Sequence, residues 1–171
     1  IRKMGDKGQA KAAAREAECP TVPGSVGVVD DVEDAMDIAE KIGFPVMIKA
    51  TAGGGGRGMR LALTQDKFVN AFTTARAEAN SAFGNPDVYI EKAVQRPKHV
   101  EVQIIADSHG NVVHFGERDC SVQRRHQKLI EEAPCPVISK ELREKMGEAA
   151  VRCARQVNYC GAGTIEYLLD A

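Results

Sequence analysis

The stretch Lys49-Ala-Thr-Ala-Gly-Gly-Gly-Gly-Arg-Gly-Met59 holds four consecutive glycines between two apolar, strand-like segments. Glycine loses more backbone entropy on folding than any other residue, so such a run needs a physical reason. One reason is a loop whose bare NH groups close on an anionic ligand, and the flanking Lys49 and Arg57 suit a phosphate. The alternative is a flexible hairpin tip with solvated charges, and composition alone leaves both interpretations open.

Two familiar glycine motifs do not explain this loop. Gly53, Gly55 and Gly58 satisfy G-x-G-x-x-G, but that dinucleotide fingerprint needs a helix that opens inside it. Here residues 59–64 predict a strand, and helical spacing begins only afterwards. The Walker A pattern fails because Met59, rather than Lys-Ser/Thr, follows the last glycine. A strand–glycine loop–strand order instead indicates a flap over nucleotide phosphates, as in the protein-kinase glycine loop.

The overall composition is that of an ordinary globular protein. The chain has 171 residues, long enough for one good core or two small subdomains, with 43% hydrophobic and 27% charged residues. A net charge of −1 gives no general argument for nucleic-acid or membrane binding. No apolar run predicts a membrane span, and no signal-peptide pattern is present. Because the chain starts at Ile1 without a methionine, we expect a piece of a longer protein.

Five cysteines are present, an odd number, and none are spaced as C-x-x-C. We expect reduced, mostly buried thiols rather than a metal site. The cysteines are Cys19, Cys120, Cys135, Cys153 and Cys160.

Residues 22–92 predict an α-β-β-α-β order, a small α+β unit with the glycine loop at one edge. A preceding linker helix is expected over residues 3–18 and should end before Pro20. Asp30 or Asp31 can cap the first helix of the unit, and Gly43 should end it. Residues 65–82 carry apolar side chains at helical spacing. The expected strands cover residues 44–50, 59–63 and 88–90, the last running into Glu91.

A second unit follows, and its first strand has one apolar and one polar face. Val100, Val102 and Ile104 alternate with His99, Glu101 and Gln103. A turn at residues 107–110 leads into residues 111–115, and we expect residues 116–136 to be irregular and heavily charged. A helix over residues 139–158, capped by Ser139, and a strand over 164–169 complete the unit.

Three further features carry possible chemistry. Lys49 is either a solvated edge residue or a phosphate ligand. The charged run at residues 117–132 favours a solvated loop with salt bridges, and an anion site of Arg, His and Lys is the sharper alternative. Its lack of aromatics argues against RNA binding. Glu166 lies mid-strand, so burial would imply a metal or a basic partner, whereas a solvated face would imply neither. The four histidines show no metal-ligand spacing.

The chain as a whole resembles biotin carboxylase, the ATP-grasp component of biotin-dependent carboxylases. The resemblance runs from end to end in the same order and includes residues 4–7, 23–25, 43–50, the glycine loop, 117–128, 131–134 and 163–166. It implies an ATP-grasp fragment: a linker helix from a missing N-terminal domain (1–21), the lid or B subdomain (22–93) and the first part of the C-terminal portion (94–171).

The resemblance also implies an activity and a set of roles. MgATP, with Mn²⁺ as an alternative metal, and bicarbonate would give carboxyphosphate, from which the carboxyl group passes to N1 of biotin. Lys128 would bind bicarbonate and Glu166 would be the first magnesium ligand. The nucleotide would be contacted through its phosphates, adenine and ribose by Lys7, Lys49, Gly55, Gly56, Glu91, Lys92, Ala93, Val94, His99 and His126.

Implied partners are a biotinylated carrier protein or domain, a carboxyltransferase and a second copy in a homodimer, with no nucleic acid and no membrane span. Several acyl-CoA and pyruvate carboxylases share this component. Residues 43–53 and 112–118 favour the separate-subunit acetyl-CoA carboxylase type of bacteria and plastids, which serves fatty acid biosynthesis. The expected compartment is the cytoplasm or plastid stroma, with the mitochondrial matrix as an alternative.

Two departures from the family pattern matter. Ala52 replaces a glycine that many members carry, and the chain stops before the second magnesium-binding glutamate and the biotin-contacting arginine. We therefore expect the isolated 171 residues to be inactive or nearly so. The alternatives are another ATP-grasp ligase, such as a carbamoyl-phosphate synthetase half or a D-alanine ligase relative, and a non-catalytic nucleotide-binding module.

Overall fold

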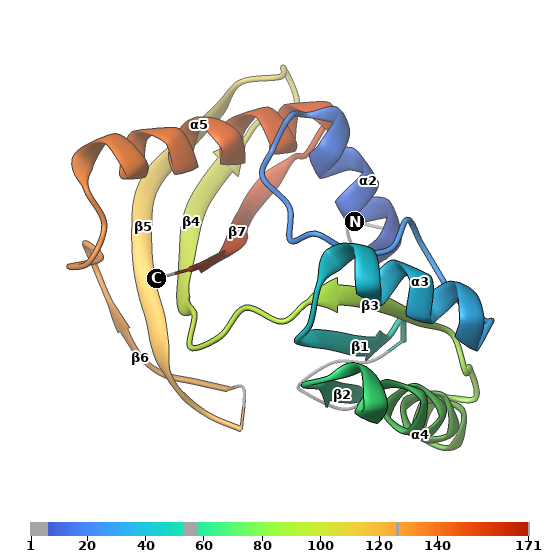
Figure 1. The fold of residues 1–171 in the computed structure, drawn as a ribbon. Helices are drawn as coiled ribbons and strands as arrows, with labels where there is room; N and C mark the ends of the chain where they lie inside the picture. The colour runs from blue at the N-terminus through green and yellow to red at the C-terminus, as the bar shows by residue number, and fades with distance from the viewer. Residues whose placement is uncertain (1–6, 53–57, 126, 171) are drawn as a thin grey trace. The chain divides into compact units, whose positions relative to one another are not determined.

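A computed structural model describes residues 7–52, 58–125 and 127–170 (Figure 1). The described elements are, in chain order, α2 (Lys7–Glu16), α3 (Val32–Ile42), β1 (Val46–Ala50), β2 (Met59–Ala62), α4 (Gln65–Phe83), β3 (Val88–Lys92), β4 (Lys98–Ala106), β5 (Val112–Arg124), β6 (Gln127–Glu132), α5 (Lys140–Gln156) and β7 (Gly161–Leu169). None of these helices has the length and apolar character needed to cross a membrane.

The chain divides into two compact units. The glycine-loop unit comprises Val22–Ala93 and the first residues of α2, and the long-sheet unit comprises Gln9–Thr21 and Val94–Ala171. Each unit has its own hydrophobic core. The roles of lid and C-terminal portion that the resemblance gives to these segments remain predictions.

The sheet of the glycine-loop unit has three antiparallel strands in the order β2-β1-β3. Val46, Ile48 and Ala50 alternate with half-buried residues because they face a core shared with α3 and α4. On α4, Phe68 and Phe72 are buried one helical turn apart, and their rings stack. The predicted α-β-β-α-β order is therefore confirmed, with β1 and β2 slightly shorter than expected.

The two ends of α3 follow the predicted capping chemistry, whereas no cap was predicted for α4. The Asp31 carboxylate accepts hydrogen bonds from the first-turn backbone NH groups of Glu33 and Asp34, at 2.7 and 3.1 Å. Gly43 ends α3, and Gly84 ends α4 in the left-handed region at φ 68°. Asp31, rather than Asp30, is thus the cap.

The glycine loop is closed at its base by a backbone hydrogen bond from Ala50 to Gly58, 2.8 Å long. Gly58 has φ +69°, and a Cβ built on it would lie 2.7 Å from the Ala50 Cβ. Only glycine fits here without a shift of the neighbouring strand. The loop tip, which includes the predicted phosphate-binding Gly55 and Gly56, lies outside the described residues.

The long-sheet unit contains a four-stranded antiparallel sheet in the order β6-β5-β4-β7. Helix α5 lies across one face of this sheet (Figure 1). Ser139 caps α5 as predicted by accepting the Leu142 NH at 3.2 Å. Val100, Val102 and Ile104 of β4 pack beneath the helix with Met146 and Ala150. Because side chains alternate along a strand, the residues between them face the other side of the sheet.

The prediction that residues 116–136 are irregular is wrong. Most of this segment is regular, because β5 continues to Arg124 and pairs with β6 in an antiparallel hairpin. The charged side chains misled the composition argument, since Glu117 and Asp119 are buried and each has a cationic partner, Arg143 and Lys98. Likewise β7 begins at Gly161 rather than at Thr164.

Candidate functional site

Strand register brings distant polar residues together on the face of the long sheet opposite α5. In the central strand β4, Glu101 pairs with Arg118 of β5 on one side and with Glu166 of β7 on the other. Residues directly opposite one another in an antiparallel pair present their side chains on the same face. Together with Lys128 of β6 and His99 of β4, these residues form what we call the Lys128 cluster.

Glu101 is the centre of this cluster, with a side chain only 3% exposed. Its carboxylate accepts a hydrogen bond from Arg118 Nε at 2.7 Å, and further hydrogen bonds from Arg118 Nη2 and Lys128 Nζ. Burial alone would raise the pKa of Glu101, but the hydrogen bonds from Lys128 and Arg118 outweigh it and hold the pKa below its ordinary value. The buried carboxylate is therefore ionised and doubly paired at neutral pH.

Lys128 lies between two carboxylates. Its ammonium donates to Glu101 and, at 3.0 Å, to Glu166 Oε1. Burial would lower the pKa of Lys128, but the hydrogen bonds to Glu101 and Glu166 raise it well above its ordinary value. The side chain is still 29% exposed, so a permanently cationic group is available on this face of the sheet.

His99 lies near the second carboxylate oxygen of Glu166, the one that Lys128 does not contact. Its backbone NH donates to Ser121 Oγ at 3.0 Å, and its ring Nδ1 contacts the Gln123 side-chain amide nitrogen. With the amide assigned in that orientation, Nδ1 accepts, and the ring proton lies on Nε2. His99 Nε2 lies 3.6 Å from Glu166 Oε2. Glu166 therefore fits neither of the two interpretations fully. Its carboxylate is half-exposed, as a solvated face would require, yet it has basic partners, as a buried one would.

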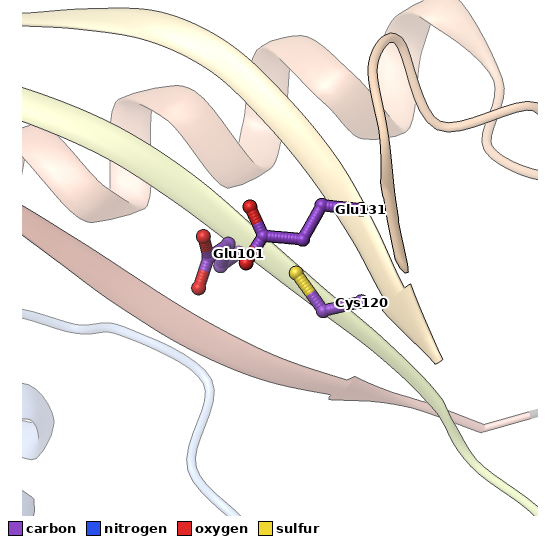
Figure 2. Close-up of side chains that lie close together, drawn as sticks. All are labelled: Glu101, Cys120 and Glu131. Atoms are coloured by element: carbon purple, nitrogen blue, oxygen red, sulfur yellow. The ribbon is translucent and has the colours of Figure 1, made fainter. Parts of the chain in front are cut away.

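Glu101, Cys120 and Glu131 point toward one another with ligand atoms within 4.8 Å, as Figure 2 shows. The surrounding charges argue against a cation here, because Arg118 contacts both carboxylates, with Nε 2.7 Å from Glu101 and 3.6 Å from Glu131. Burial, followed by the charge of Glu101, raises the pKa of the Cys120 thiol to about 11. A protonated thiol and two paired carboxylates form an ion-pair network rather than a metal site.

Glu166 fits a magnesium ion better. Its carboxylate is 53% exposed and supplies the hard oxygen that Mg²⁺ prefers. Mg²⁺ is usually held by one or two carboxylates together with substrate phosphates, so a single such residue in this segment is compatible with that ion.

In the glycine-loop unit, Lys49 is paired with Glu91 across β1 and β3, with Nζ 3.1 Å from Oε2. Tyr89 hydrogen-bonds to the same carboxylate, and burial, followed by the charge of Glu91, raises the pKa of the Tyr89 hydroxyl. These side chains project from the sheet face opposite the helices. The lysine is 22% exposed, so it is neither a freely solvated edge residue nor sealed in the core.

Of the other residues predicted to contact the nucleotide, Lys92, Ala93 and Val94 follow Glu91 directly in the chain. The Lys92 ammonium donates to the carbonyls of Gly43 and Phe44, at 2.9 and 3.0 Å, and so stabilises the C-terminus of α3. Ala93 is buried, and its NH donates to the Pro45 carbonyl at 3.0 Å. Val94 is half-buried in the connection to β4. Side-chain positions of Lys7 and His126 lie outside the described residues, although Lys7 begins α2.

The structure thus brings His99, Lys128 and Glu166 together and, separately, Lys49 and Glu91. Glu101 and Arg118 organise the first group. Sequence reasoning assigned no role to Glu101 and considered Arg118 only as part of a possible anion site in the charged run. The sequence signal available for Glu101 was only its place in the middle of a strand of alternating apolar and polar residues, where a carboxylate that becomes buried requires a partner.

The mixed helix and sheet architecture, which the chain shares with solved biotin carboxylase structures, is that of an ATP-grasp domain. The chain belongs to the family described as carbamoyl-phosphate synthase L chain, ATP binding domain, which it matches over residues 6–171.

The curated relatives and solved structures that the chain resembles include biotin carboxylases. The chain is 61% identical to biotin carboxylase from Nostoc sp. over 99% of its own length and 38% of the relative's. It superposes with a TM-score of 0.94 on a crystal structure of a biotin carboxylase–β,γ-ATP complex from Campylobacter jejuni, with 48% identity over 99% of this chain and 38% of that one.

A second solved structure is the biotin carboxylase domain of Hydrogenobacter thermophilus 2-oxoglutarate carboxylase, in complex with MgADP, ADP and bicarbonate. It matches with a TM-score of 0.93 and 47% identity over 99% of this chain and 37% of that one. The chain therefore spans a little over a third of the length of these relatives.

Proposed function

We propose that the protein carboxylates biotin, using ATP and bicarbonate through carboxyphosphate, in the first half-reaction of acetyl-CoA carboxylase or a related carboxylase. The observation that carries this proposal is Lys128, a cation held between Glu101 and Glu166 on an exposed sheet face. Such a group suits a small anion that must approach a second, highly charged anion. The similarity to a biotin carboxylase domain bound to MgADP and bicarbonate supports the same assignment.

Lys128 would bind bicarbonate. Its charge is balanced by two glutamates before any ligand arrives, so an added anion must replace one of these interactions. Glu166 is the exposed partner and Glu101 the buried one, so the Glu166 contact is the one that can open. Glu101 would then keep the ammonium in position while bicarbonate takes the open side.

Glu166 would hold Mg²⁺ together with the nucleotide phosphates. When bound, the metal offsets phosphate charge and orients the terminal phosphoryl group. With Glu166 turned to the metal, one carboxylate fewer competes for Lys128. Coupled metal and bicarbonate binding follows from this shared partner.

The further nucleotide contacts follow the resemblance to biotin carboxylase. Lys49 would leave Glu91 to contact phosphates. Lys7 would also contact phosphates, and the NH groups of Gly55 and Gly56 would close on them. Backbone groups of residues 91–94 would lie beside the adenine, since the Lys92 side chain is already committed to the end of α3. His99 and His126 would contact the ribose and the rest of the nucleotide.

The proposed partners are a biotinylated carrier protein or domain, a carboxyltransferase and a second copy of the full-length protein. Bacterial and chloroplastic proteins are both among the relatives, which supports a cytoplasmic or plastid location for this one. The separate-subunit acetyl-CoA carboxylase type remains the favoured assignment.

The test is ADP release by the full-length protein, with and without bicarbonate and free biotin, alongside Lys128→Ala. We expect turnover to need both substrates and to fall roughly tenfold or more in the variant. Gln127→Ala, an exposed neighbour on β6, is the matched control and should retain turnover. A rate of ADP release that does not depend on bicarbonate would instead indicate another ATP-grasp ligase or a non-catalytic nucleotide site.

A further inference from the structure

The segment that follows α2 is fixed against the last turns of α5 within the long-sheet unit. Arg152 Nε donates to the Ala17 carbonyl at 3.3 Å, and the Cys19 thiol donates to the Ala149 carbonyl at 3.0 Å. Ala17 is buried, and the Cys19 backbone NH donates to Ala14 at 2.8 Å. Cys19 is therefore held at a defined position on the helix surface.

A second thiol lies at the same position. Cys153 stands one helical turn after Ala149, and side chains of a helix lean toward its N-terminus, over the preceding turn. Its thiol thus approaches the Ala149 carbonyl, which the Cys19 thiol contacts at 3.0 Å, and each of the two thiols affects the pKa of the other. Cys19 is half-buried, Cys153 is 4% exposed, and both are free thiols.

We propose that Cys19 and Cys153 form an oxidation site. A low-molecular-weight disulfide is the oxidant, and the product is a Cys19–Cys153 bond that links the segment after α2 to α5. The proposed biotin carboxylation uses neither thiol. The Cys19 thiol contacts the Ala149 carbonyl and Cys153 stands one turn later on the same helix, so two cysteines from distant parts of the chain are neighbours at one place, as a disulfide requires.

The reaction is a two-step exchange. The Cys19 thiol, which is the more accessible, loses its proton to solvent and attacks one sulfur of the small disulfide RSSR. This forms a mixed disulfide on Cys19 and releases one RSH. The deprotonated Cys153 sulfur then attacks the Cys19 sulfur, forms the Cys19–Cys153 bond and releases the second RSH. The protein loses two electrons and two protons, and RSSR is reduced to two RSH.

The surroundings of the two thiols make this exchange slow. Burial raises the pKa of Cys19 against the opposing charge of Arg152, and burial and the neighbouring Cys19 raise the pKa of Cys153 to about 11. Tyr167, which lies near both thiols, is also protonated because burial raises the pKa of its hydroxyl. Both cysteines are thus thiols at neutral pH and react only under a sustained excess of disulfide.

The bond would close a long loop, since Cys19 and Ala149 alone are 130 residues apart. A long closed loop restricts the unfolded chain, so oxidation should stabilise the fold. We expect the thermal midpoint of the oxidised protein to rise by roughly 4 °C or more, and the rise to disappear on reduction.

The test treats the reduced intact protein with excess oxidised glutathione, blocks the remaining thiols with N-ethylmaleimide and maps tryptic peptides by mass spectrometry. The expected product joins the peptide Glu16–Lys41, which contains Cys19, to the peptide Cys153–Arg155. Cys19→Ser and Cys153→Ala should each abolish it. Cys160→Ser, which removes an exposed thiol, is the control and should leave it unchanged.

The wild-type digest decides the matter even if a variant fails to fold. The proposal is overturned if Cys19 is recovered as its glutathione adduct while Cys153 carries N-ethylmaleimide. It is equally overturned if Cys19 is linked to another cysteine, or if both thiols are alkylated after Cys160 has reacted fully.

Discussion

Lys128 Nζ lies 3.0 Å from Glu166 Oε1, although the two residues belong to the two edge strands of the four-stranded sheet. Neighbouring strands are about 4.8 Å apart, so a flat sheet would separate the two backbones by roughly 14 Å. The contact exists because the sheet is twisted and two long side chains reach over Glu101 in the middle. A cation and two carboxylates are thereby held in one line across the sheet.

Removing the charge of Glu101 should change the pH dependence of the proposed reaction. Hydrogen bonds to Glu101 and Glu166 raise the pKa of Lys128 against the opposing effect of burial. In Glu101→Gln the pKa of Lys128 therefore falls, and the loss of bicarbonate-dependent ADP release at high pH should begin at a lower pH than in the wild type.

Glu131→Gln is the matched control for that profile. Glu131 lies 3.6 Å from Arg118 and its side chain is 43% exposed, but it is not among the groups that raise the pKa of Lys128. Its alkaline limb should coincide with the wild-type limb. Profiles of Glu101→Gln and the wild type that superpose would show that Glu101 does not control the ionisation of Lys128.

Acid should weaken the long-sheet unit through the same glutamate. Burial opposes ionisation of Glu101, but hydrogen bonds from Lys128 and Arg118 lower its pKa, so its contribution to stability is complete above the unfolded value of about 4.3. That contribution is lost as the pH falls through the folded pKa. Thermal midpoints measured between pH 7 and pH 3 should drop less steeply for Glu101→Gln than for the wild type, and equal slopes would contradict the linkage.

Gly58→Ala should destabilise the glycine-loop unit by about 1–3 kcal/mol, because alanine is strained at φ +69° and its Cβ would clash with Ala50. Gly84→Ala separates these two effects. Gly84 has a similar φ of +68° but open space around its Cβ position, so only the backbone strain remains. Urea unfolding should give the larger loss for Gly58→Ala, and the reverse order would rule out the clash as the cause.

Phe68→Ala should cost about 3–5 kcal/mol of folding free energy, since its ring is fully buried between Phe44 and Phe72. Val69→Ala on the same helix removes an apolar side chain that is 50% exposed and should change stability by about 0.5 kcal/mol or less. Denaturant titrations of both variants provide the comparison. Similar losses would mean that α4 does not bury the face given by its spacing.

Features that depend on neighbouring residues in the chain could be predicted from the sequence alone. Asp31 and Ser139 cap their helices, and Phe68 and Phe72 face the core because their helical spacing requires it. The glycine run was placed between β1 and β2 for the same reason. Backbone preferences and side-chain periodicity act over one or two turns, so they can be read without knowing the fold.

Tertiary structure alone decided how the charged residues are used. Composition predicted an irregular segment at 116–136, yet Glu117 and Asp119 lie in a strand because their partners come from α5 and β4. The central place of Glu101 follows from register with Arg118 and Glu166, which no local pattern specifies. Ion pairs between residues far apart in the chain depend on strand order and sheet twist, and these are fixed only when the whole sheet assembles.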